Sequence, residues 1–385
     1  MSFFKYASSL LMASALSLGA LSAQAETIRI GLIGSLTGGG AAWGQAMHQG
    51  AKIAADRKNA AGGITVGDKT YDLEVIAYDD HYKAADAVGA YNRLVHQDGA
   101  RFVVLMGSAG ALAVKQNVED DQILALTSAY STKVIDDDTR YMFRLFSTAH
   151  DYARGLIEWT AENHPERRIV VLNPNDETGW DQQQVTEPIY RELGYEILAA
   201  EQYERTLQDF QPLFTKILAL NPDIVDFGST SPATAGLMTR QIREMGYKGK
   251  LTKTGGAGPE EIVAAAGPEA AEGMISVLYA DPANPGFQDL MAAYKENTGH
   301  DGNAIIVAFY DAINVLIAAM EASEDPADAS KVAEAFATAL PATSVQGDPL
   351  TPGSLSADGK PRQILTTMYV GQIENGEAVS KGAIQ

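Results

Sequence analysis

Short apolar segments alternate with amphipathic, helix-like segments along most of the chain. Each apolar segment has the length and composition of a buried strand, and most are followed by a segment with helical character. The candidate strands are Thr27–Ile33, Leu73–Asp80, Arg101–Gly110, Ile123–Thr132, Arg168–Asp176, Asp223–Ser231 and Lys250–Gly256. Near-continuous apolar strands that alternate with helices are typical of a parallel sheet covered on both faces. The pattern therefore predicts an α/β fold.

The alternation occurs in two series, and the second begins at Arg168. Later in the chain, Gly273–Asp281 has the character of a strand that crosses between lobes, and Ile364–Ile373 has that of a closing strand. No low-complexity linker separates the two series, so crossing strands rather than a flexible tether must join them. We predict two doubly wound parallel-sheet lobes.

The first 25 residues have the pattern of a cleaved signal peptide. Lys5 provides a positive charge, Tyr6–Ala20 is apolar and uncharged, and Ala23–Ala25 fits the small residues before a cleavage site. The apolar run is short compared with the ~20 residues of a membrane-spanning helix. The chain has no cysteine, which excludes disulfides and a lipid-modified N-terminal cysteine. We expect export to the periplasm without a membrane anchor.

The composition argues against several classes of protein. With 385 residues, 46% of them hydrophobic, the chain can bury a substantial core. Its formal net charge of −20 disfavours binding to nucleic acids and to anionic lipid. The sequence has no phosphate-binding lysine loop, no GxGxxG spacing, no HExxH pair and no GxSxG elbow. We predict no cofactor, no metal site and no catalytic residues, and we read Asp79–His81 as a polar turn rather than a metal site.

Small and polar residues follow most of the candidate strands. In open parallel sheets, ligands bind outside the carboxyl ends of the strands. The segments at these ends are GSLTGGG, YDDHY, GSAG, TSAYST, NPNDETGW, GSTSP and TGGAG. Such residues bring backbone N–H groups and hydroxyls close to a ligand, and a helix N-terminus favours an anion. Two lobes that face each other with these ends would form a clamp around a small anionic ligand.

Five segments, in this order and spacing, resemble the branched-chain amino-acid-binding family, the type I periplasmic solute-binding proteins of ABC importers. They are residues 28–64, 74–88, 107–113, 123–132 and 267–274. The resemblance implies two lobes joined by a three-strand hinge, which close on the ligand. It places the crossings near Phe143–Ser147, near Ser276–Asp281 and after Thr343. We therefore expect a signal peptide at 1–25, lobe 1 at 26–145 and 279–345, and lobe 2 at 146–278 and 346–385.

The resemblance also implies a function. Members of this family deliver a small solute to a membrane permease and make or break no bond, so we expect a monomeric binding protein whose partner is an ABC permease. The alternative is a ligand-sensing receptor that uses the same clamp to signal to a chemoreceptor or regulator.

Several residues of the first lobe match the family's ligand site. Trp43 matches an apolar wall, and Tyr130 offers an aromatic face. Ser108, followed by Ala109, and Ser131 match hydroxyls that bind the ligand's carboxylate together with backbone N–H groups. Ala129 matches a backbone carbonyl that accepts from the ligand. From the residues alone, Trp43 would also suit a core position, and the two serines would suit helix caps.

The second lobe departs from the family pattern. Thr178 and Trp180 stand where a tyrosine is common, Thr230 stands where an aromatic residue is common, and Gly256 stands near the position of the acid that pairs with a ligand ammonium. A buried ammonium without a partner is costly, whereas a carboxylate held by N–H and hydroxyl groups is tolerated. Two ligand classes remain open: an amino acid whose ammonium uses Asp176, Glu177 or a carbonyl, or a bulkier carboxylate without the amine, such as an aromatic acid.

Overall fold

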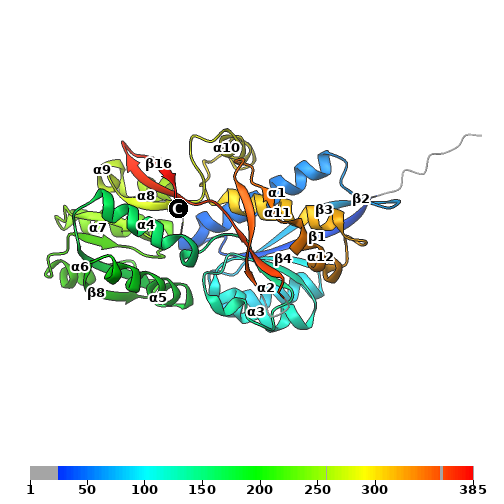
Figure 1. Ribbon diagram of the computed structural model, residues 1–385, viewed down its shortest axis with the longest axis horizontal. Coiled ribbons are helices and arrows are strands. Elements are labelled where there is room, and N and C mark those ends of the chain that lie inside the picture. The colour runs from blue at the N-terminus through cyan, green and yellow to red at the C-terminus, as the bar shows by residue number, and fades with distance from the viewer. Residues whose placement is uncertain (1–24, 257, 356–358, 385) are drawn as a thin grey trace, which may run out of the picture.

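Two α/β lobes lie side by side in the computed structural model, which describes residues 25–256, 258–355 and 359–384 (Figure 1). Each lobe has its own sheet with helices on both faces, which confirms the predicted fold class. The expected signal peptide at 1–25 lies almost entirely outside the described residues. Among the helices that the structure describes, none combines the length and the apolar composition needed to cross a membrane.

The first lobe is built on a nine-stranded sheet. In spatial order, its strands are β12 (Ala342–Thr343), β13 (Pro349–Leu355), β14 (Pro361–Leu365), β6 (Met142–Arg144), β5 (Leu124–Thr127), β4 (Phe102–Leu105), β1 (Glu26–Gly34), β3 (Lys69–Asp79) and β2 (Ile64–Val66). The strands from β14 to β3 are parallel, and antiparallel strands complete both edges.

The second lobe is built on a seven-stranded sheet. In spatial order, its strands are β16 (Glu377–Ala383), β15 (Tyr369–Glu374), β11 (Ile275–Leu278), β10 (Lys250–Lys253), β9 (Ile224–Asp226), β7 (Arg168–Pro174) and β8 (Glu196–Tyr203). The strands from β11 to β8 are parallel, and a β-hairpin from the C-terminal tail adds the other two.

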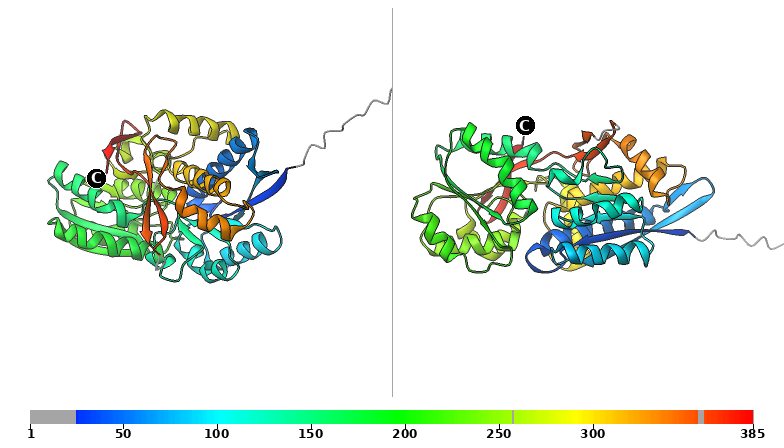
Figure 2. Two further views of the ribbon diagram at one scale, coloured as in Figure 1. Left: turned by 45° about the vertical axis from the view of Figure 1, so that its right-hand side comes forward. Right: turned by 90° about the horizontal axis from the view of Figure 1, so that it is seen from below.

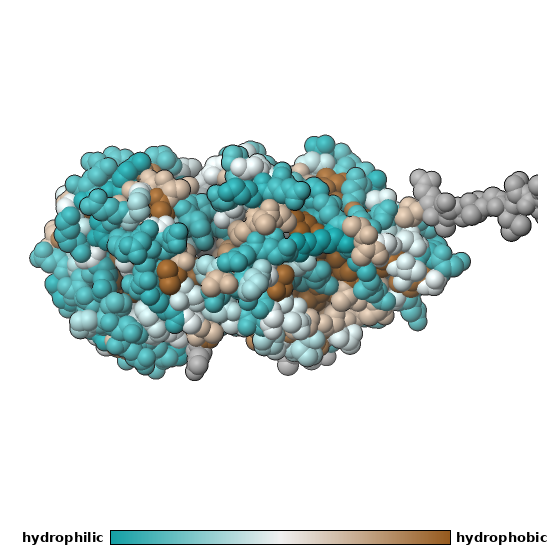
Figure 3. All heavy atoms as spheres, turned by 90° about the horizontal axis from the view of Figure 1, so that it is seen from above, coloured by the Kyte–Doolittle hydropathy of each residue, from teal (hydrophilic) through white to brown (hydrophobic). Residues whose placement is uncertain are grey.

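Helices cover both faces of each sheet. In the first lobe, one face packs against α2 (Ala84–His96) and α3 (Ser108–Asp120), and the other against α1 (Ala41–Ala60), α11 (Ile306–Ala322) and α12 (Ala329–Phe336), with α10 (Pro285–Thr298) alongside. In the second lobe, one face packs against α4 (Ala149–Asn163) and α5 (Glu177–Glu192), and the other against α6 (Gln211–Leu218), α7 (Pro232–Glu244), α8 (Pro259–Ala266) and α9 (Pro268–Ala271). On the outside, the face shown in Figure 3 is mostly hydrophilic, with scattered apolar patches.

The strand register brings the small and polar segments to one edge of each sheet. In the first sheet, Gly34 pairs with Asp79, and Ile33 pairs with both Tyr78 and Leu105, so β1, β3 and β4 end together. Each of these strands leads into a helix. The same arrangement recurs in the second lobe, where Asp176 begins α5 by accepting hydrogen bonds from the backbone of Thr178 and Gly179.

Three short segments join the lobes, as predicted. Residues 145–148 lead from β6 to α4, residues 279–284 lead from β11 to α10, and residues 366–368 lead from β14 to β15. The first and third segments are bonded to each other, since Ser147 Oγ donates to Thr366 O (2.8 Å) and accepts from Thr366 N (2.9 Å). The crossings between the lobes are seen from two further directions in Figure 2.

The C-terminal tail differs from the sequence prediction in two respects. The predicted closing strand Ile364–Ile373 is two strands, β14 and β15, that belong to different sheets. In addition, β13 and β14 pair within the first sheet, although the sequence analysis assigned residues from 346 onward to lobe 2. The reason is that Gln363 pairs with Arg144 on β6, so the tail stays with the first sheet until residue 365.

Candidate functional site

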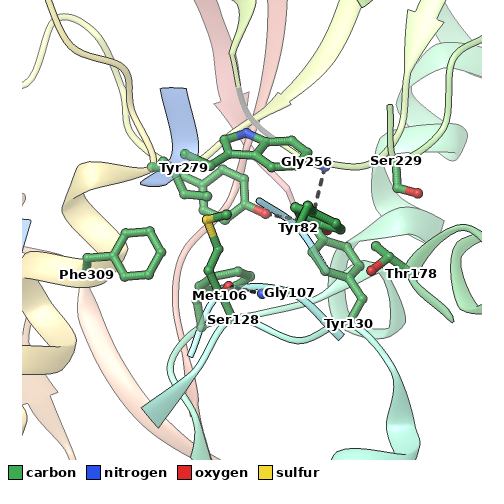
Figure 4. A pocket seen from close by; sticks show the side chains of 13 residues that line it. Tyr82, Met106, Gly107, Ser128, Tyr130, Thr178, Ser229, Gly256, Tyr279 and Phe309 are labelled. Atoms are coloured by element: carbon green, nitrogen blue, oxygen red, sulfur yellow. Dashed lines mark hydrogen bonds between the residues drawn. The ribbon is translucent and has the colours of Figure 1, made fainter. Parts of the chain in front are cut away.

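A cavity lies between the two lobes, at the carboxyl ends of strands from both sheets (Figure 4). Its empty volume is about 420 Å³, counting the gaps between atoms and the open space at its mouth. Eight of its residues come from the first lobe: Trp43, Tyr82, Met106, Gly107, Ser128, Tyr130, Ile305 and Phe309. The second lobe adds Thr178, Ser229 and Gly256, and the crossing segments add Phe146 and Tyr279.

Aromatic rings make up nearly half of the residues in the cavity wall. Six of the thirteen lining residues are aromatic, and Met106 and Ile305 add further apolar surface. The rings of Phe146 and Tyr279 meet edge to face with centroids 5.1 Å apart, so the two crossing segments pack against each other at the cavity wall. The polar lining groups are hydroxyls and backbone atoms, and no Asp, Glu, Lys or Arg is among the described lining residues. This chemistry suits a flat apolar ligand with a small polar group.

The hydroxyl of Tyr130 links the two lobes. It lies 2.9 Å from the hydroxyl of Tyr152 and 2.6 Å from that of Tyr279, and it accepts a hydrogen bond from the backbone N–H of Gly256 (3.2 Å). Burial raises the pKa of all three tyrosines, so their hydroxyls are neutral at physiological pH. This cluster therefore fixes the second-lobe wall against the first lobe without placing a charge in the cavity.

Tyr130→Phe is expected to weaken ligand binding about fivefold to tenfold, because it removes the acceptor of the Gly256 N–H while keeping the ring. The loss of one such hydrogen bond corresponds to ~1–1.5 kcal/mol. Calorimetric titration of the wild type and of Tyr130→Phe with the same ligand measures the difference in affinity. Tyr141→Phe is the matched control, since the Tyr141 hydroxyl bonds to Ser330 away from the cavity (3.2 Å). Equal affinity in both variants would show that the Tyr130 bridge does not support closure.

Ser108 lies directly behind the cavity and is fully buried. Its hydroxyl oxygen accepts from the backbone N–H groups of Tyr130 and Ser131 and from the hydroxyl of Thr178, each at 3.1 Å. The Thr178 bond is a second link between the lobes. Three donors thus converge on the Ser108 oxygen, which takes the place that an anion's oxygen would need, so these donors are not free for a ligand carboxylate. The ligand role of Ser108 stays a prediction.

The other expected residues fall into two groups. Trp43, Tyr130, Thr178 and Gly256 line the cavity, whereas Ser108, Ala109, Ala129, Ser131, Trp180 and Thr230 do not. Ser131 caps a short 3₁₀ turn, where its hydroxyl accepts from the N–H of Lys133 (3.4 Å). It therefore has the capping contact that the sequence analysis left open as an alternative. Ala109 and Ala129 are neighbours of Ser108 and Tyr130 in the same two turns.

Trp180 and Thr230 do not line the cavity and have other partners. Trp180 is 46% exposed, and its indole N–H donates to Asn175 Oδ1 (3.0 Å). It lies two residues after Thr178 on α5, and residues two apart face different sides of a helix. Thr230 is fully buried, with its hydroxyl bonded to the hydroxyl of Tyr203 (2.7 Å) and to Phe227 O.

Tyr82 lines the cavity, although the sequence pattern does not predict it there. His81 and Tyr82 both have left-handed backbones, with φ of 49° and 59°. The carboxylates of Asp79 and Asp80 accept from the N–H groups of these two residues at 2.9 and 2.8 Å, and so hold this uncommon turn. The turn directs the Tyr82 ring into the cavity. The guanidinium of Arg205, which does not line the cavity, lies 4.3 Å from the centroid of this ring.

This turn also accounts for the acidic cluster at Asp79–His81. The carboxylates are used by backbone N–H groups, as the polar-turn reading expects. In the part of the chain that the structure describes, no group of three or more His, Cys, Asp or Glu side chains could hold a metal ion. The only sequence signal for Tyr82 is its place after a strand end. Its left-handed backbone is visible only in the structure, and strained backbone is common at ligand sites.

Comparisons with known proteins agree with this architecture. The model of the periplasmic binding protein family matches residues 27–378. A leucine-, isoleucine-, valine-, threonine- and alanine-binding protein of Pseudomonas aeruginosa is 28% identical over 315 residues, which cover 81% of this chain and 82% of that protein.

Solved structures share the fold. The isoleucine complex of a branched-chain amino acid transporter's substrate-binding protein from Streptococcus pneumoniae has a TM-score of 0.78 at 22% identity, covering 93% of this chain and 99% of that one. A benzoate complex of an ABC-transporter solute-binding protein from R. palustris has a TM-score of 0.76 at 21% identity, covering 93% and 96%. These relatives are substrate-binding proteins, not enzymes. The chain belongs to the periplasmic binding protein family.

Proposed function

We propose that this protein is the periplasmic binding component of an ABC importer, and that it carries a small carboxylate that bears an aromatic ring and no ammonium. The observation that supports this ligand most strongly is the cavity wall, which has six aromatic residues and no carboxylate among its described residues. An ammonium in such a cavity would lack a charged partner, and an unpaired buried charge is costly.

The cavity offers groups that suit both parts of the proposed ligand. The rings of Trp43, Tyr82 and Phe309 provide flat surfaces for an aromatic ring. The hydroxyl of Ser128 can donate to a carboxylate while its oxygen accepts from the N–H of Gly107 (3.1 Å). The hydroxyls of Thr178 and Ser229 donate to Ser108 (3.1 Å) and Asn173 (3.5 Å), so they would have to turn from these acceptors to reach a ligand. A carboxylate bound by hydroxyl and N–H donors needs no arginine. The Pseudomonas relative is named for amino acids, whereas the R. palustris structure holds benzoate, so the choice depends on the cavity itself.

A thermal-shift panel on refolded, ligand-stripped protein tests this proposal. The panel compares L-leucine, L-isoleucine and L-phenylalanine with benzoate, 4-hydroxybenzoate and 3-phenylpropanoate. A ligand present at ~100–1,000 times its dissociation constant stabilises the folded protein by ~2.7–4.1 kcal/mol, which raises the melting temperature by several degrees. We expect the amine-free acids to give this shift. A shift with amino acids alone would contradict the proposal and would show that the ammonium has a partner in this cavity.

A further inference from the structure

A buried lysine lies directly behind the second-lobe wall of the cavity. Lys253 is the last residue of β10, three positions before Gly256, and only 1% of it is exposed. Its ammonium donates to the backbone oxygens of Gly255 and Gly256, the latter at 2.6 Å. A Cβ atom on Gly256 would lie 3.1 Å from Lys253 Nζ. Because Gly256 lines the cavity, a single residue without a side chain stands between this nitrogen and the ligand space.

Lys253 also contacts the opposite lobe. Its Nζ lies 5.8 Å from the ring centroid of Trp43, which lines the cavity from α1. The lysine, Gly256 and the tryptophan therefore form one corner of the cavity, with the cation against the ring face. This is the corner at which the resemblance to the amino-acid-binding family places an acid that pairs with a ligand ammonium. The chain has a base there instead.

Three other charged groups face Lys253. Asp226 on β9 and Glu261 on α8 attract its ammonium, and Arg205, between β8 and α6, repels it. Both carboxylates have hydrogen bonds of their own: Asp226 accepts from the hydroxyls of Thr252 (3.0 Å) and Thr254 (2.7 Å), and Glu261 Oε1 accepts from Asn303 (2.7 Å), whereas Glu261 Oε2 is buried without a hydrogen-bond partner. Lys253 Nζ donates to the backbone oxygens of Gly255 and Gly256 at the cavity wall. These bonds hold the ammonium next to the wall.

We propose that Lys253 is a specificity-determining residue: its charge behind Gly256 favours ligands that are anionic or neutral at this corner of the cavity and rejects those that carry an ammonium. The inference rests on the proposed function and names the residue that enforces it. Inside a protein, two like charges a few ångströms apart repel far more strongly than in water. Lys253 therefore acts as a positioning charge behind the wall, without touching the ligand.

A dependence of binding on pH follows from the surroundings of Lys253. Burial lowers its pKa to about 7, against the attraction of Asp226 and Glu261. A bound carboxylate favours the protonated lysine and so raises this pKa, which means that binding takes up protons near and above pH 7. The affinity for a carboxylate is highest at pH values below the Lys253 pKa of the free protein. It declines as the pH rises from that value through the higher Lys253 pKa of the complex.

Calorimetric titration of Lys253→Met tests the inference. The probes are 3-phenylpropanoate and L-phenylalanine, which differ only by the α-ammonium, and the readout is the ratio of their dissociation constants. We expect the wild-type preference for the acid to fall by ~10-fold or more in the variant. Lys250→Met is the matched control, because Lys250 lies on the same strand and is paired with Glu166 (3.7 Å), away from the cavity. The control is expected to keep the wild-type ratio.

Titration of the wild-type protein in two buffers of different ionisation enthalpy, at about pH 7.5, gives an independent readout. We expect proton uptake with 3-phenylpropanoate in the wild type and in Lys250→Met, and none in Lys253→Met. If the wild type prefers the acid but Lys253→Met keeps both the ratio and the proton uptake, the inference is wrong and the proposed function stands. If the wild type prefers L-phenylalanine or binds neither probe, both are wrong.

Discussion

Gly256→Val is expected to weaken ligand binding at least ~100-fold, which corresponds to ~2.7 kcal/mol. Gly256 lines the cavity with a left-handed backbone (φ 72°), and its backbone lies against Trp43. A Cβ atom at this position would lie 2.8 Å from Trp43 Cζ2, which is closer than real Cβ contacts allow. The two branches of valine would therefore either displace the tryptophan or occupy the space of the ligand.

Titration with 3-phenylpropanoate measures this effect, and Gly246→Val separates it from backbone strain. Gly246 has a similar left-handed backbone (φ 88°), but no atom lies within 4 Å of the place its Cβ would take. Both variants are expected to lose a similar amount of stability from the strained valine, and only Gly256→Val is expected to lose affinity. A similar loss of affinity in both variants would mean that the effect comes from strain and not from the cavity.

Gly179→Ala is expected to lower the free energy of unfolding by ~3–4 kcal/mol. Gly179 lies in the first turn of α5, and a Cβ atom there would lie 1.8 Å from the backbone oxygen of Pro174 at the end of β7. The turn would have to move away from the strand, which would also weaken the bond from the Gly179 N–H to the capping carboxylate of Asp176 (3.0 Å). Because Thr178 is in this turn, the displacement also reaches the cavity.

Thermal and urea unfolding of ligand-stripped protein measure this loss, with Gly89→Ala as the control. Gly89 lies within α2, and its Cβ would meet no atom within 4 Å. Alanine is the better helix former, so the control is expected to gain ~0.5–1 kcal/mol. The two glycines are both helical and differ in the space around them. A Gly179→Ala protein as stable as the wild type would contradict the close packing of α5 on β7.

The sequence predicted the parallel strands because their burial on both faces leaves a continuous apolar signal. It also predicted Trp43, Tyr130, Thr178 and Gly256 at the cavity, since strand ends and the family resemblance place them there. The C-terminal tail was harder to predict. A change of sheet between β14 and β15 takes only residues 366–368, and those residues have no composition that distinguishes a crossing from a strand.

The direction of individual side chains could not be predicted from sequence position. Trp180 is two residues from Thr178, yet the helix turns it to solvent. Tyr82 enters the cavity because two consecutive residues have left-handed backbones, a conformation that the sequence DDHY does not predict. Lys253 is one of two lysines in the strand KLTK, and the sequence does not indicate that it lies buried behind Gly256 and over the ring of Trp43 from α1. Backbone geometry decides the direction of Trp180 and Tyr82, and tertiary packing decides that of Lys253.

The interlobe cavity is expected to accept a carboxylate and to reject the same molecule with an ammonium. Direct titration of the ligand-stripped wild-type protein with 3-phenylpropanoate and with L-phenylalanine, at one pH below 7, tests it most simply. Tighter binding of 3-phenylpropanoate, by ~10-fold or more, is the result that the aromatic wall and Lys253 predict. Tighter binding of L-phenylalanine would contradict the account and would mean that an ammonium finds a partner in this cavity.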